Sequence, residues 1–319
     1  MKTRIRRLRP FAALTLTSLA LLAIACGGGG DDGDSWSPRA IAVDQDAPVV
    51  PVLFTSQISV GPNRIAFGLF DRDGALLSEL AASVRIFAVE EDAGTLVSAH
   101  ELERVEMRPS TTHEHADGEL HPHASEPIAV FVTTAEFARP GDWGAEVTAE
   151  LAGETTVVRM LFTVLERTTE PMLGERIPGS VQRVLRDVDD IAEIDSSLPP
   201  EPRMHEVTVA EALEDGLPAV IVIATPAFCQ SRFCGPVVDE VVRPLEERHR
   251  GAATFIHIEP FDLAEARGGR LVVLPVMAEW GLMTEPWIFV VDREGRLAAK
   301  FEGVTSAAEV EAALLAVLE

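Results

Sequence analysis

The apolar pattern of this chain changes at about residue 167, and this change limits the possible folds more than any other feature. Between residues 49 and 166, short runs rich in Val, Ile, Phe and Thr alternate with turn formers such as Gly61-Pro62-Asn63 and Pro140-Gly141-Asp142. The expected strands cover 49–55, 64–71, 83–90, 128–134, 144–151 and 155–165. Because no helical stripe competes here, residues 49–166 are predicted to form an all-β immunoglobulin-like sandwich.

Beyond residue 167, strand candidates alternate with helix signals. The strand candidates cover 218–224, 254–258 and 287–292. Capping boxes at Thr208 with Glu211 and at Ser306 with Glu309 predict two helix starts, and apolar residues at helical spacing over 181–194 predict a further helix. Strands separated by helices predict an α/β sheet with parallel members and helices on both faces.

The N-terminus predicts export. Lys and Arg crowd the first ten positions, an apolar run covers 11–25, and Ala23-Ile24-Ala25 precedes Cys26. This pattern resembles a bacterial lipoprotein signal peptide, in which small residues precede a cysteine that becomes lipidated. About 15 apolar residues are too few for a transmembrane helix, which needs roughly 20. We therefore expect a signal peptide over 1–25, a lipid anchor on Cys26, a flexible tether over 26–48, and a location on the extracytoplasmic face of a cell membrane.

The charge balance argues against nucleic acid as a partner. The chain has 27 Lys+Arg against 51 Asp+Glu, a formal net charge of −24. Phosphate recognition needs clustered cations, and no basic stripe follows the first ten residues. Hydrophobic residues at 47% fit a globular chain that buries a core.

The cysteines form one local pair. The chain has three cysteines, and with Cys26 lipidated only Cys229 and Cys234 remain, in a compartment where disulfides persist. If a helix begins at Gly235 or Pro236, Cys229 lies in the loop before it and can fold back to bridge Cys234. A cysteine at a helix start can have its thiolate stabilised by the free amides there. Pro244 is expected to kink or end that helix.

Residues from about 204 to the C-terminus resemble the thioredoxin-like superfamily. The shared features are a strand followed by cysteine and then a helix with an internal proline, a second strand over 255–259, and Trp280-Gly281-Leu282-Met283-Thr284-Glu285-Pro286 before a third strand. The resemblance implies a thioredoxin-like fold over 204–319, with residues 167–203 as a linker containing a helix. It also implies a cis peptide bond at Pro286 beside the active cysteines. Two departures stand out: four residues separate Cys229 from Cys234 where thioredoxins have two, and the strand over 218–224 lacks the buried acid of thioredoxins.

A histidine-rich stretch interrupts the strand pattern between residues 108 and 126. It is expected to be a polar loop, and it carries His113, His115, His121 and His123. Imidazoles two residues apart on an extended segment can be presented to one Cu or Zn ion, so these four residues are a candidate metal site. The alternative is a solvated loop without a bound metal. Elsewhere, His257 and Glu259 share one face of their strand and are expected to form a buried, satisfied pair.

Three functions remain open on the sequence. The first is a redox-active thiol–disulfide oxidoreductase without a cofactor, acting on protein thiols or disulfides through Cys229, Cys234 and Pro286. One thiolate would attack and the other would resolve the mixed disulfide, in an order that the sequence leaves open. The second is a copper or zinc metallochaperone using the cysteines and the histidine-rich loop. The third is a non-catalytic lipoprotein whose Cys229–Cys234 disulfide bond is structural.

Overall fold

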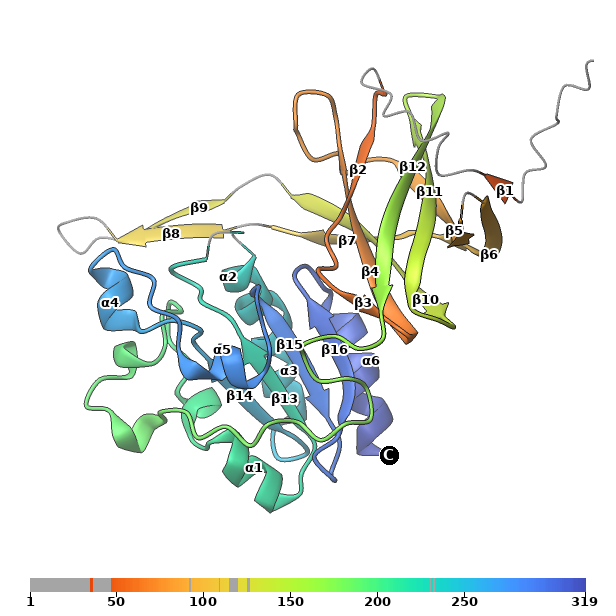
Figure 1. The fold of residues 1–319 in the computed structure, drawn as a ribbon. Helices are drawn as coiled ribbons and strands as arrows, with labels where there is room; N and C mark the ends of the chain where they lie inside the picture. Colours follow the sequence, from red (N-terminus) through yellow and green to blue (C-terminus); the bar gives the residue numbers. More distant parts are fainter. Residues whose placement is uncertain are drawn as a thin grey trace, which may run out of the picture.

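A computed structural model describes residues 35–36, 47–91, 93–108, 110–114, 120–124, 127–229, 231 and 233–319. The expected signal peptide, Cys26 and His115 lie outside these ranges. The described chain has an all-β N-terminal part and an α/β C-terminal part (Figure 1). Within it, no helix has the length and apolar character needed to cross a membrane.

Two sheets pack around one core in the N-terminal part. Their strand orders are β1-β6-β5-β11-β12-β3 and β2-β4-β10-β7. The strands are β1 (Ser35–Trp36), β2 (Val50–Leu53), β3 (Ile58–Ser59), β4 (Gly61–Phe70), β5 (Ala81–Glu90), β6 (Ala93–Glu101), β7 (Glu103–Met107), β10 (Ile128–Phe137), β11 (Gly141–Leu151) and β12 (Glu154–Leu165). Phe67 and Phe131 of one sheet share an apolar cluster with Ile86 and Trp143 of the other. The all-β character is thus confirmed, while the immunoglobulin-like topology stays a prediction.

The histidine-rich stretch was expected to be a loop, and this expectation is wrong for its backbone. Strands β8 (Ser110–Glu114) and β9 (Leu120–Ala124) pair as an antiparallel hairpin, with His113 opposite His121 and Thr111 opposite His123. The run Ser110-Thr111-Thr112 favours extended backbone, which explains why a polar segment pairs as strands. The hairpin reaches from the β7 and β10 strands toward the C-terminal part, where β8 lies beside α2 (Cys234–Pro236) (Figure 1).

The C-terminal sheet has the order β14-β13-β15-β16. Strand β13 (Ala219–Ile223) runs parallel to β14 (Thr254–Ile258) and antiparallel to β15 (Trp287–Val291), which pairs with β16 (Leu297–Glu302). A tight turn joins β15 to β16, where the Gly295 N–H donates to the Asp292 carbonyl oxygen. All five residues of β13 are buried, as expected for a central strand covered on both faces.

Helices cover both faces of this sheet. The helices are α1 (Val209–Asp215), α2, η5 (Val237–Val242), α3 (Arg243–His249), α4 (Leu263–Arg267), α5 (Pro275–Glu279) and α6 (Ala307–Leu318). Successive strand residues face opposite sides. Accordingly Val220 and Val222 pack with η5, α3 and α6, whereas Ile221 and Ile223 pack with α1 and α5. The expected capping boxes of α1 and α6 are both present.

The helix expected over residues 181–194 does not form. The chain instead makes two 3₁₀ turns, η2 (Leu185–Asp187) and η3 (Ile191–Glu193). The Asp187 and Asp190 carboxylates accept hydrogen bonds from the Val184 and Ala192 backbone amides, which favours turns over a continuous helix. The prediction failed because the apolar spacing reflects packing of an irregular segment against the C-terminal part.

Pro244 alters the cysteine-bearing helix without ending it. The helical segment runs without a break through α2, η5 and α3, from Cys234 to His249. In η5 it has π-helical geometry, and the Arg243 N–H donates to the Val238 carbonyl five residues back. A proline has no N–H and crowds the carbonyl of the preceding turn, and the wider π turn before Pro244 relieves that crowding.

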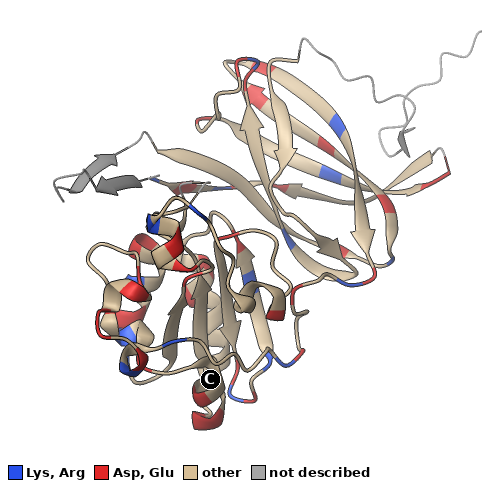
Figure 2. Cartoon of the chain, turned by 60° about the vertical axis from the view of Figure 1, so that its left-hand side comes forward, with Lys and Arg blue, Asp and Glu red and all other residues tan. Residues whose placement is uncertain are grey.

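The two parts of the chain contact each other. Arg64 of β4 donates to the Glu309 carboxylate at 2.7 Å and to the Val304 carbonyl oxygen at 2.9 Å. Ala66 and Val132 of the N-terminal part belong to the same apolar cluster as the residues beneath α6. Figure 2 shows acidic residues distributed over both parts of the molecule.

Candidate functional site

Cys229 lies in the loop that follows the central strand. The buried residues of β13 end at Ile223, and the chain then turns at Pro226 and Ala227 before reaching the partly exposed Cys229. The Ala227 N–H donates to the Ser196 hydroxyl at 3.1 Å, which ties this loop to the segment before α1. The fold therefore presents one cysteine at the surface, directly after the most buried strand.

Cys234 is the first residue of the helix and is buried. The helix thus starts slightly earlier than the expected Gly235 or Pro236. A proline is tolerated at this third helical position, since the first N–H groups of a helix have no partner within it. One of these free groups, the Cys234 N–H, donates to the Cys229 sulfur at 3.4 Å. The helix terminus therefore stabilises negative charge on Cys229 rather than on Cys234.

The loop before β15 brings a carboxylate to both sulfurs. The Glu285–Pro286 peptide bond is cis, as the resemblance implied. The Glu285 carboxylate accepts a hydrogen bond from the Cys234 thiol and lies 3.5 Å from the Cys229 sulfur. The two sulfurs and a Glu285 oxygen all lie within 4.8 Å of one another. The structure therefore brings Cys229 and Cys234 together, with the residue before the cis Pro286 close to both sulfurs.

Sequence reasoning missed Glu285. It noted that the first strand lacks a buried acid, and the structure supplies a carboxylate from a different loop. A signal was present, because Glu285 directly precedes the proline that was expected to lie beside the cysteines. An ionisable side chain at that position is brought to the sulfurs whenever the proline is.

The two sulfurs have opposite pKa shifts. The Cys234 thiol shares its single proton between the Glu285 carboxylate and the Cys229 sulfur. Its hydrogen bond to Cys229, with smaller contributions from Ser231 and from backbone amides, lowers the pKa of Cys229 to about 5 against the effect of burial. Burial, followed by the interactions with Cys229 and Glu285, raises the pKa of Cys234 well above the ordinary value. Both cysteines are free thiols, so the structure represents the reduced pair. At neutral pH the site holds one thiolate and one thiol.

The other predicted site residues are not joined to this site by any described side-chain contact. Cys26 and His115 lie outside the described residues. His113, His121 and His123 are placed by their backbone only, on the hairpin whose strand β8 lies beside α2. Trp280 and Trp287 are both buried in the core.

Comparison with known proteins adds little to this geometry. No protein-family model matches the chain, and no curated protein matches it. One solved structure, a thiol:disulfide interchange protein of the thioredoxin family from Chlorobium tepidum TLS, is similar at 16% sequence identity with a TM-score of 0.27. The match covers 40% of this chain and 92% of that one. At this TM-score the likeness carries no argument about function, and the geometry of the site has to carry any conclusion.

Proposed function

We propose that the protein is a thiol–disulfide oxidoreductase in which Cys229 is the attacking thiolate and Cys234 the resolving thiol. One observation carries this proposal: a partly exposed cysteine with a pKa of about 5 lies against a buried cysteine whose pKa is raised. A structural disulfide needs no such asymmetry. An exchanger needs it, because the exposed sulfur must be a thiolate before it meets the substrate.

In the first step the Cys229 thiolate attacks a sulfur of the substrate disulfide. The substrate S–S bond breaks, a Cys229–substrate disulfide forms, and the other substrate sulfur leaves as a thiolate that takes up a proton from water. The partial exposure of Cys229 allows this contact, whereas the buried Cys234 cannot make it. We therefore propose that Cys229 attacks first, a point that the sequence left open.

In the second step Cys234 attacks the Cys229 sulfur and frees the substrate. Once Cys229 is in a disulfide its negative charge is gone, and with it one of the causes that raise the pKa of Cys234. The Glu285 carboxylate accepts a hydrogen bond from the Cys234 thiol and can take its proton as the new bond forms. The products are a Cys229–Cys234 disulfide and two substrate thiols; the protein gives up two electrons and the single proton of Cys234, and the second proton comes from water.

Trapping the mixed disulfide tests this order. Cys234→Ser removes the resolving sulfur but keeps a hydrogen-bond donor, so we expect the variant to accumulate a disulfide between Cys229 and glutathione when treated with oxidised glutathione. Cys229→Ser is the matched control and should form little adduct. Mass spectrometry of the full chain, with Cys26→Ser in both variants, measures both. Equal adduct formation by the two variants would contradict the proposed roles.

Export and lipid anchoring at Cys26 are proposed on the sequence pattern alone. A lipidated Cys26 would hold the two described parts at the extracytoplasmic face of a membrane, where disulfide exchange has substrates. Cys26→Ser should move the protein from the membrane fraction to the soluble fraction. Unchanged membrane association of that variant would count against the anchor.

A second candidate function is metal transfer, favoured by the donor set at the same site. Two sulfurs and one carboxylate oxygen lie within 4.8 Å of one another, and the backbone of the histidine-rich hairpin lies beside α2. Thiolate donors with imidazoles nearby suit copper or zinc. If this were the function, the reduced protein would bind about one Cu or Zn ion at these cysteines, and Cys229→Ser would abolish that binding. A protein that exchanges disulfides and binds neither metal at these cysteines would exclude it.

A further inference from the structure

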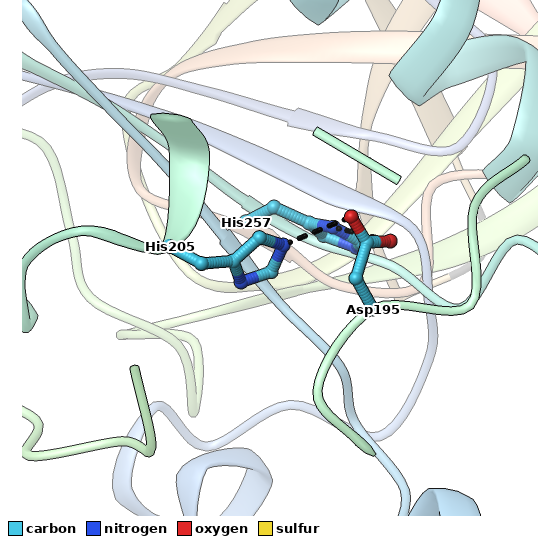
Figure 3. Close-up of side chains that lie close together, drawn as sticks. All are labelled: Asp195, His205 and His257. Carbon is cyan, nitrogen blue, oxygen red and sulfur yellow. Dashed lines mark ion pairs between the residues drawn. The ribbon is translucent and has the colours of Figure 1, made fainter. Parts of the chain in front are cut away.

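A second cluster of ionisable side chains lies inside the C-terminal part, apart from the cysteines. Asp195 follows η3, His205 ends η4 (Pro202–His205), and His257 lies in β14. Figure 3 shows the two imidazole rings turned toward the same carboxylate. The side chains of Asp195 and His257 are 0% exposed, and that of His205 is 2% exposed. Three separate elements therefore bring two histidines and a carboxylate together where water has almost no access.

The spacing of the donor atoms is that of metal ligands. His205 Nε2 lies 3.1 Å from one Asp195 oxygen, and His257 Nδ1 lies 3.5 Å from the other. Neither nitrogen makes a well-aligned hydrogen bond with a described residue. Zinc bonds of about 2.0–2.1 Å in a tetrahedron place neighbouring ligand atoms about 3.3–3.4 Å apart. The observed distances fall on either side of that value, and the three donor atoms all lie within 4.8 Å of one another.

Surrounding hydrogen bonds hold the donors in place for a cation. The other nitrogen of His257, Nε2, lies 3.0 Å from the Ala224 carbonyl oxygen, so it carries the proton and leaves Nδ1 as the nitrogen able to bind a metal. The Ser197 and Glu201 backbone amides donate to the Asp195 carboxylate at 2.8 Å and 2.9 Å. Such second contacts, which fix the tautomer and the carboxylate, are typical of protein metal sites.

A cavity gives the cluster an open side. A space of about 300 Å³ is lined by His205 and His257 together with Glu259 and residues of the 180–183 segment. Glu259 is 4% exposed; one of its oxygens accepts the Ser196 N–H, and Oε2 has no hydrogen-bond partner among the described residues. The expected satisfied pair of His257 and Glu259 is thus buried but not satisfied.

We propose that Asp195, His205 and His257 form a zinc site with its fourth coordination position open to this cavity. Two imidazoles and one carboxylate are a ligand set that zinc uses, and a fourth position occupied by water is typical of sites where zinc can act as a Lewis acid. Copper(II) prefers a tetragonal arrangement, and the donor spacing fits a tetrahedron better. The site contains neither cysteine and does not depend on the proposed thiol chemistry.

Metal analysis of the full chain purified in detergent tests the assignment. The other candidate ligands are first removed in one background variant, with Cys229→Ser, Cys234→Ser and His→Gln at positions 113, 115, 121 and 123. We expect this background to retain about one zinc ion per chain after dialysis against a weak chelator. His205→Gln and His257→Gln should each reduce the retained zinc at least tenfold. His249→Gln is the matched control, because His249 pairs with Glu311 away from the cluster, and it should retain zinc fully.

Two further measurements keep the test decisive. Replacing zinc with Co²⁺ should give the visible bands of a tetrahedral site without a thiolate charge-transfer band. Asp195→Asn keeps the shape of the side chain and one oxygen to accept from the Ser197 or the Glu201 amide, so it carries the test if a histidine variant fails to fold; it too should lose zinc. A background variant that retains no zinc, Asp195 and His257 variants that retain as much zinc as the background, or preferential retention of copper or iron would each overturn the proposal.

Discussion

The low pKa of Cys229 depends on a donor at position 234, which predicts a contrast between two substitutions. The hydrogen bond from the Cys234 side chain is the largest of the effects that lower this pKa from 9.0 to about 5. Cys234→Ala removes the donor, whereas Cys234→Ser replaces the thiol with a hydroxyl that can still donate. We therefore expect the alanine variant to raise the pKa of Cys229 by about one unit or more, and the serine variant to leave it close to the wild-type value.

The expected effect is measurable as an alkylation rate. In chains with Cys26→Ser, each variant has Cys229 as its single thiol, and the rate of reaction with iodoacetamide follows the thiolate fraction. At about pH 5.5, a pKa of 5 gives a thiolate fraction of about 0.76 and a pKa of 6 gives about 0.24, a roughly threefold lower rate relative to the plateau. Equal midpoints for the alanine and serine variants would refute the role assigned to the donor. A wild-type midpoint above about 8 would refute the thiolate itself.

Three other substitutions give distinct outcomes. Glu285→Gln, in chains with Ser at position 229, should lower the pKa of the buried thiol, because the carboxylate is one of the groups that raise it; a thiol titration that does not move would contradict this. Gly281→Ala should lower the melting temperature strongly, since a Cβ there would lie 2.1 Å from a backbone oxygen, whereas Gly216→Ala, also at positive φ but in open space, should cost only about 1 kcal/mol. Arg64→Ala should cost about 1–3 kcal/mol of unfolding free energy at neutral pH, and denaturant titrations from pH 3 to 7 would show it as a loss of pH dependence. The direction of this pH dependence follows from the pKa of Glu309: burial raises it, but Arg64 lowers it below the value of the unfolded chain. The stability that the pair contributes is therefore fully present above the unfolded pKa and is lost as the pH falls through the folded pKa.

Local patterns predicted much of the C-terminal fold. A fully apolar run predicted the buried strand β13, and Ser306 with Glu309 predicted the start of α6. Each of these depends on a few neighbouring residues, and for that reason each can be read without knowledge of the tertiary structure. The cis bond at the proline before β15 was expected from the resemblance and is present.

Residues that act through distant partners could not be predicted in this way. Asp195 lies in the stretch expected to be a linker with a helix, His205 lies just after that stretch, and only the folded chain brings them to His257. The apolar spacing around Val184 and Ile194 imitated a helical stripe, although these side chains are buried from an irregular segment. Long-range packing determines which side chains of an irregular segment are buried, and the periodicity of the sequence does not predict such packing.

For the hairpin of β8 and β9, the sequence analysis predicted too little regular structure. Polar composition between residues 108 and 126 favoured a loop, yet the backbone of β8 and β9 pairs in register. Strand pairing depends on backbone hydrogen bonds and on β-branched residues such as Thr111 and Thr112, and it does not require an apolar face.

The reduction potential of the Cys229–Cys234 pair tests the central claim most directly. It can be measured by thiol labelling of the Cys26→Ser protein across glutathione buffers and stronger dithiol buffers. A stabilised Cys229 thiolate favours the reduced form, so the account predicts a value between about −270 and −120 mV, the range of known disulfide exchangers. A value below about −300 mV would mark a structural disulfide and would contradict the proposed function.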